Sequence, residues 1–292
     1  MKNAFTVSPM SQKINLKPGE TYRGWVMVAN PAAATEDFYY KIEVKPYSVL
    51  GENYDTDFET ESDWSRVVNW ITLEDDTGVL KPNDMKKVYF TIDVPESAPG
   101  GGQYATFVVS SDAPANNEGG VAIQSVYEMA SLLYAEVAGE LKHEGKILNN
   151  EITVFVASGN PKIFTRFENK GNVHETAEVT ITVKNNLNGE TVFPKGDEKN
   201  TFESVIMPES VRMVSRDLTN LPPLGIFEVT ETVSYLGDEM GVTSVIVVCP
   251  IWFLALIFAT IGSVIGMILY GRYLKHKKLK KFEMDSEKSV EN

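Results

Sequence analysis

The chain has 292 residues, and its 40 acidic and 27 basic side chains give it a formal net charge of −13. The acidity lies in the N-terminal part: residues 1–244 hold 20 basic and 36 acidic side chains, whereas residues 271–292 hold 7 basic and 4 acidic ones. Such an acidic surface excludes binding to nucleic acid or anionic lipid by simple charge attraction.

Cysteine content and glycosylation motifs indicate the cellular compartment. Cys249 is the only cysteine, so residues 1–244 contain no disulfide. The sequence also contains no Asn-x-Ser/Thr acceptor site. Both absences are unusual for an animal cell-surface protein and favour a prokaryotic surface.

Alternation of apolar and polar residues with period two runs through the first 244 residues and predicts half-buried strands. The clearest runs are residues 38–45, 87–94 and 179–184. Turn signals rich in Pro, Gly and Asn separate them, and no convincing helical period precedes the C-terminal apolar run. Short, regularly spaced strands predict an all-β fold made of sandwiches.

An internal repeat divides this region into two copies. Asn30 lies fourteen residues before Val44, and Asn169 lies fourteen residues before Val183; both valines end an alternating run. Residues 121–137 are expected to form the closing strand of the first copy. We therefore predict two tandem sandwiches over residues 1–139 and 140–243.

The first copy carries an acidic, aromatic insertion over residues 51–67, which we expect to be a long exposed loop. Aromatic rings stack on sugar faces and anchor protein interfaces. Trp64 in this loop is the best candidate for exposure, and Tyr54 and Tyr104 are further candidate ligand contacts. The alternative is that the loop has no binding role.

Metal and catalytic signals are weak. Alternating carboxylates in the insertion offer oxygens to calcium, but the loop lacks the glycine of an EF-hand turn, which favours a solvated acidic loop. The three histidines are scattered, and no nucleophile elbow or phosphate loop occurs. We expect no cofactor, no metal and no catalysis, with a hydrolase using two facing carboxylates as the third-ranked function. The loop carboxylates are Asp55, Asp57, Glu59, Glu61 and Asp63.

Residues 245–270 form a run of 26 residues without a charged side chain. A bilayer core of roughly 30 Å needs about 20 apolar residues in a helix, so residues 244–271 are predicted to cross the membrane. Basic residues follow the run, and Asp238 and Glu239 precede it, so the positive-inside rule places the tail, residues 272–292, in the cytoplasm. Trp252 and Tyr270 lie near the two ends, as interfacial aromatic residues do.

This topology requires a leader peptide, yet residues 1–5 contain no apolar run. We expect that a leader has been removed or that the start codon is misplaced. A tail-anchored protein with cytosolic sandwiches is the alternative, although it contradicts the charge asymmetry.

Small residues within the apolar run form one stripe at helical spacing. Such stripes let two transmembrane helices approach closely, so the stripe predicts a homodimer through this helix. The stripe consists of Ala255, Ala259, Gly262 and Gly266.

Short motifs resemble those of a known family. They are residues 5–9 (FTVSP), 16–20 (LKPGE), 28–31 (VANP), 94–104 (VPESAPGGGQY) and 169–174 (NKGNVH). Together with the whole-chain layout, they resemble the WxL-interacting proteins of Gram-positive bacteria. The resemblance implies two Ig-like domains, the first binding peptidoglycan, then a transmembrane helix and a basic tail.

The expected function is a membrane-anchored binding or adhesion protein that contacts cell-wall glycan or another surface protein. The alternative is a scaffold or chaperone-like component of a surface or secretion complex. Exposed, unpaired edge strands would favour the alternative, because chaperones of this shape work by strand donation.

Overall fold

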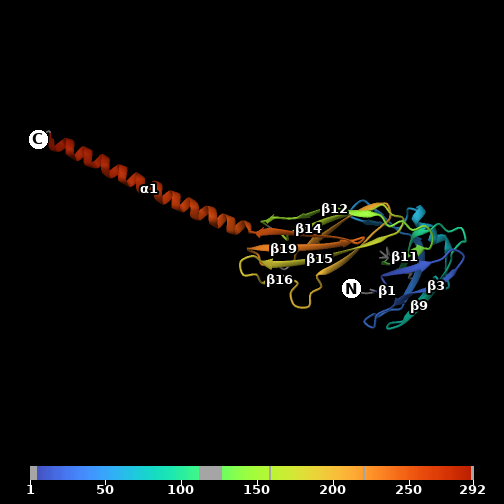
Figure 1. Cartoon of the computed structure of the whole chain (residues 1–292). Coiled ribbons are helices and arrows are strands. Elements are labelled where there is room, and N and C mark those ends of the chain that lie inside the picture. The colour runs from blue at the N-terminus through green and yellow to red at the C-terminus, as the bar shows by residue number, and fades with distance from the viewer. Residues whose placement is uncertain (1–4, 112–126, 158, 220, 291–292) are drawn as a thin grey trace.

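A computed structural model describes residues 5–111, 127–157, 159–219 and 221–290, with side chains as far as residue 278. The chain forms two β-sandwiches followed by one helix (Figure 1). This confirms the predicted all-β fold with a C-terminal helix. The helix leaves the second sandwich at the end opposite the first sandwich (Figure 1).

The first sandwich packs two sheets around one core, in which Phe90 and Phe107 are fully buried with ring centroids 4.6 Å apart. One sheet consists, in spatial order, of β1 (Thr6–Ser8), β3 (Thr21–Ala29), β9 (Met85–Asp93) and β7 (Ile71–Leu73). The other consists of β2 (Ser11–Leu16), β11 (Glu128–Val137), β10 (Gly101–Ser111), β4 (Phe38–Pro46) and β8 (Thr77–Leu80). The described part of the predicted closing strand is β11, and residues 121–126 lie outside the described residues.

The second sandwich has its own core, which includes the fully buried side chains of Phe167 and Phe227. Its smaller sheet consists of β12 (Gly145–Ile152), β14 (Lys162–Asn169) and β18 (Ser210–Asp217). Its larger sheet consists of β13 (Phe155–Val156), β20 (Asp238–Val248), β19 (Gly225–Tyr235), β15 (Glu175–Asn185) and β16 (Thr191–Phe193), with β17 (Thr201–Ile206) also paired to β15.

Both sandwiches share one topology, as the internal repeat predicted. In the first, the N-terminal strand is divided between the sheets: β1 pairs antiparallel with β3, and β2 pairs parallel with β11. In the second, β12 pairs antiparallel with β14, and β13 pairs parallel with β20.

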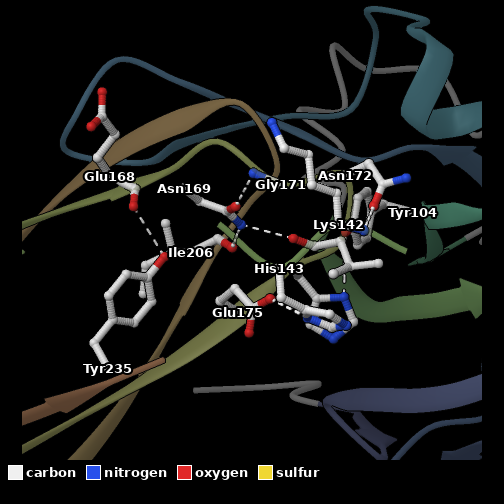
Figure 2. A network of polar contacts seen from close by, with 12 residues as sticks. Tyr104, Lys142, His143, Glu168, Asn169, Gly171, Asn172, Glu175, Ile206 and Tyr235 are labelled. Atoms are coloured by element: carbon white, nitrogen blue, oxygen red, sulfur yellow. Dashed lines mark hydrogen bonds and ion pairs between the residues drawn. The ribbon is translucent and has the colours of Figure 1, made fainter. Parts of the chain in front are cut away.

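The repeated asparagine has the same structural role in each sandwich. Asn30 donates from Nδ2 to the carbonyl of Leu80, and Asn169 donates from Nδ2 to the carbonyl of Ile206, each at 3.0 Å. Both asparagines are buried, and each also bonds to the loop that follows its own strand (Figure 2 shows Asn169). Because buried carbonyls need donors, this bonding explains why asparagine recurs at this position.

The prediction of a long exposed loop over residues 51–67 is wrong. The insertion forms a hairpin of β5 (Ser48–Leu50) and β6 (Asp55–Asp57), followed by the 3₁₀ helix η1 (Asp63–Trp70). The Ser62 hydroxyl caps η1 by accepting from the Trp64 N–H, and the Ser65 hydroxyl accepts from the Ser62 N–H. Val67 is then fully buried in the core. The low aliphatic content of the insertion concealed this element.

The predicted start of the apolar helix also needs correction. Residues 245–248 belong to β20, and α1 spans Ile251–Val290. The apolar run therefore joins a strand to a helix, because hydropathy does not distinguish residues buried in protein from residues suited to lipid. Within Ile251–Lys278 of α1, an 18-residue window has a mean hydropathy of 2.3 and none of it is buried, so the helix is long and apolar enough to cross a membrane.

Candidate binding surface on the second sandwich

The three predicted ligand contacts lie at the junction between the sandwiches. Tyr104 is fully buried there, and Tyr54 and Trp64 are half-buried. They pack with the remaining members of the junction cluster, so the prediction that they face a ligand is corrected: the aromatic insertion covers the second sandwich. The other members of the junction cluster are Tyr47, Val49, Phe58, Leu132, Tyr134, Val205 and Met207.

Polar contacts attach the insertion to β14, to β18 and to the turn before β18. Glu52 pairs with Arg166 through Oε2 and Nε at 2.7 Å, and the Arg166 guanidinium holds the pKa of the Glu52 carboxyl below its usual value. The Glu52 carbonyl accepts from the Met213 N–H at 2.8 Å. The Tyr54 hydroxyl accepts from the Met207 N–H at 2.9 Å. The turn of the β5–β6 hairpin therefore occupies the outer edge of β18 at Met213.

The glycine-rich bend at residues 100–102 makes a second connection, to Asn172, which Figure 2 shows beside Tyr104. The Gly102 N–H donates to the Asn172 carbonyl at 2.7 Å, and the Asn172 side chain donates to the carbonyls of Gly100 and Glu140. Gly101 has a φ of +133°, and a Cβ there would lie 2.8 Å from the Asn172 carbonyl oxygen. Glycine at this position allows the two backbones to approach closely.

His174 completes the junction. Its Nδ1 lies 3.3 Å from the Tyr104 hydroxyl, and its ring centroid lies 5.3 Å from that of Tyr134. Burial, with a smaller contribution from the Lys13 charge, lowers the pKa of His174 to about 4. Burial also raises the pKa of both tyrosines. The junction therefore holds neutral rings at neutral pH, which suits contact between two sandwiches rather than proton transfer.

Three acidic side chains of the insertion are engaged locally. Asp57 accepts from the Glu59 N–H, the Glu59 carboxylate pairs with Lys45 at 2.7 Å, and Asp63 pairs with Arg66. Across the part of the chain that the structure describes, no group of three His, Cys, Asp or Glu residues is arranged to hold a metal ion. The calcium hypothesis gains no geometric support.

The outer edge of β20 is the main exposed feature of the second sandwich. The other edge of β20 pairs with β19 without interruption from Asp238 to Val248. On the outer side, β13 covers only Val247 and Val248. Within the described residues, the outer edge from Asp238 to Ile246 has no strand beside it.

The hydrogen bonds at the end of β20 show which residues face outward. Val247 donates its N–H to the carbonyl of Val154, and Cys249 donates to that of Val156. Because successive residues of a strand face opposite edges, the odd-numbered residues direct their N–H and C=O groups outward. All four of these residues are exposed. These outward-facing residues are Glu239, Gly241, Thr243 and Val245.

Other exposed edges carry features that protect them from pairing. A bulge between Ile147 and Asn149 interrupts β12. The Glu52 carbonyl occupies the edge of β18 at Met213. The Gln12 side chain donates to the Trp25 carbonyl on the edge of β3 at 3.2 Å. The regular, uncovered edge of β20 is therefore the candidate binding surface. It was missed from the sequence, although the alternation over residues 240–246 marks it as a strand.

These features define a chain of two tandem Ig-like sandwiches, each with a divided first strand, followed by a helix that could span a membrane. No known family profile matches the chain, and no curated protein matches it. The resemblance to WxL-interacting proteins stays a prediction.

Similar solved structures include those of fimbrial chaperones. A chaperone–tip adhesin complex of CFA/I fimbriae biogenesis is 17% identical, with 85% of this chain and 100% of that chain covered and a TM-score of 0.38. The class 5 fimbriae chaperone CfaA is 16% identical, with 84% and 99% covered and a TM-score of 0.37. The CsuC–CsuE complex of Acinetobacter baumannii is 12% identical, with 83% and 98% covered and a TM-score of 0.39. With TM-scores this low, the functional proposal rests on the geometry of the chain itself.

Proposed function

We propose that the chain is a membrane-anchored, non-catalytic scaffold that binds an extended segment of another surface protein by strand addition to β20. The observation that carries this proposal is the regular outer edge of β20, which is uncovered from Asp238 to Ile246 within the described residues. Such an edge is a template for a further strand. A glycan-binding adhesin loses support, because its candidate aromatic residues pack between the sandwiches.

Four outward-facing residues supply the backbone groups for recognition. Each hydrogen bond to an added strand contributes roughly 0.5–1.5 kcal/mol net, so a segment pairing along this edge gains several kcal/mol before its ordering cost. Met240 and Val242 are half-buried beneath the edge and offer apolar contacts to alternate side chains of the partner. Asp238 and Glu239 are exposed at the start of the edge and favour a basic segment.

The direction of β20 disfavours a second copy of this chain as the partner. Since β20 leads into α1, two copies in one membrane, related by a two-fold axis along the membrane normal, would place their β20 strands parallel. Identical residues would then lie at the same height, with N–H facing N–H and C=O facing C=O. Symmetric self-pairing therefore forms no ladder, which favours a different chain as the source of the strand.

The orientation of the chain follows from charge. Residues 1–244 carry the net negative charge and residues 271–292 the net positive charge. We therefore place the sandwiches outside and the tail in the cytoplasm. The junction contacts hold the two sandwiches together, so the first sandwich projects from the second away from α1 (Figure 1).

Peptide selection with hydrogen exchange tests the proposal. The full chain in detergent is screened against a library of extended peptides with alternating apolar and basic residues. We expect a selected peptide to protect the odd-numbered amides of β20 from exchange. Thr243→Pro removes an outward N–H and should abolish binding, whereas the control Thr243→Ala keeps this N–H and should bind normally. Equal binding by both variants, or protection away from β20, would contradict strand addition.

A further inference from the structure

The linker between the second sandwich and α1 is a single residue. Cys249 is bonded to the sheet, since its N–H donates to the Val156 carbonyl at 2.9 Å. The Pro250 carbonyl already accepts from the N–H groups of Phe253 and Leu254, at 2.9 and 3.1 Å. Pro250 alone therefore separates the sandwich from the helix, and the end of the sandwich lies where the helix enters the bilayer.

Aromatic residues of α1 set the depth of the helix. Trp252 and Tyr270 are 18 residues apart, or about 27 Å at the rise of an α-helix, which matches a hydrocarbon core of roughly 30 Å. Rings of this kind favour the level of the headgroups. Trp252 is three residues beyond Cys249, so their Cα atoms are separated by at most about 11 Å. The sandwich end therefore lies in or directly above the headgroup layer.

Strand register brings three further segments to this end. Gly225, at the start of β19, pairs with Val248, so Leu224 lies beside the start of α1. β13 pairs with the last residues of β20, which places Phe155 at the same end. β15 ends beside the start of β19, and Leu187 lies in the turn that follows β15. Figure 1 shows the β15–β16 turn close to the base of the helix.

The side chains in these segments are apolar and exposed. Leu187 is 80% exposed, Phe155 is 51% exposed and Leu224 is 41% exposed. Exposure of such apolar side chains to water is unfavourable, whereas their insertion into the boundary between headgroups and acyl chains is favourable. Their gathering at the end next to α1 needs an explanation that an isolated soluble sandwich does not offer.

We infer that this end of the second sandwich is a membrane seat, in which Leu187, Leu224 and Phe155 insert into the outer boundary of the bilayer around α1. The inference rests on the proposed membrane anchoring. The seat restricts tilting of the sandwich about α1, so the β20 edge stands upright from the membrane surface rather than swinging on a flexible tether.

Fluorescence quenching by lipid tests the seat. The full chain is made in a Cys249→Ser background with one cysteine at a time: Leu187→Cys, Leu224→Cys, Leu236→Cys or Phe258→Cys. Each cysteine carries an environment-sensitive dye, and the protein is reconstituted into phosphatidylcholine vesicles with brominated acyl chains. Leu236 is the matched control, because it is 37% exposed in the β19–β20 turn at the opposite end of the same sandwich. Phe258 lies within α1 and reports on membrane insertion.

We expect loss of dye fluorescence at positions 187, 224 and 258, and unchanged fluorescence at position 236. If position 258 is quenched while position 187 behaves like position 236, the sandwich does not contact the bilayer. This result would refute the membrane seat but not the membrane anchoring. Absence of quenching at position 258 would refute the membrane anchoring and the seat together.

Discussion

Protonation of His174 should weaken the junction between the sandwiches. Burial lowers its pKa from the ordinary 6.5 to about 4, so the folded chain keeps this imidazole neutral where the unfolded chain protonates it. The unfolded state binds more protons between these values, so stability is complete above about pH 6.5 and is lost as the pH falls toward 4. A difference of about 2.5 pKa units corresponds to about 3 kcal/mol.

Urea unfolding of the full chain in detergent measures this effect, with near-UV circular dichroism to follow the packing of the junction tyrosines. Wild type and His174→Gln are compared from about pH 7.5 to about pH 4.5. All other groups titrate in both proteins, so the difference between their unfolding free energies at each pH reports on His174 alone. The wild type should lose about 2–3 kcal/mol more than the variant over this range. Two parallel curves would show that His174 titrates normally and that the junction does not bury it.

Three further predictions concern separate parts of the chain. Asn169→Ala removes three hydrogen bonds inside the second sandwich and should lower its unfolding free energy by about 2–3 kcal/mol in urea titrations. An unchanged value would contradict the stabilising role of these bonds. Glu52→Gln weakens a partly exposed ion pair and should leave the free energy of unfolding almost unchanged in the same assay; a clear loss would mean that the pair is desolvated. Replacing Gly262 and Gly266 with leucine should abolish self-association in a membrane reporter assay, whereas an unchanged signal would contradict the helix dimer.

Local sequence determined much of the fold because its signals are periodic or repeated. Alternation over residues 38–45, 87–94 and 179–184 identified strands β4, β9 and β15. The repeated asparagines identified two copies, since each must supply donors to buried carbonyls at the same point of the sandwich. The length of the apolar run identified α1 as a candidate membrane span.

Tertiary structure alone decided the environments of the aromatic residues and the end of the last strand. Trp64 stands in an acidic segment, yet it is half-buried against the junction cluster. Tyr104 follows a glycine bend that packs closely against Asn172. This contact depends on a backbone about 70 residues away in the chain, so the local sequence does not reveal it. Val245 continues an apolar run, but pairing with β19 makes it part of a strand.

The candidate binding surface illustrates the same limit. The acidity of Asp238 and Glu239 and the alternation after them were visible in the sequence. Whether a strand has a neighbour on both sides depends on the order of strands in the sheet, and that order is set by contacts between distant segments. The sequence by itself therefore determined two sandwiches and an apolar helix. Only their packing left β20 with an open edge and brought Leu187 and Leu224 to the base of α1.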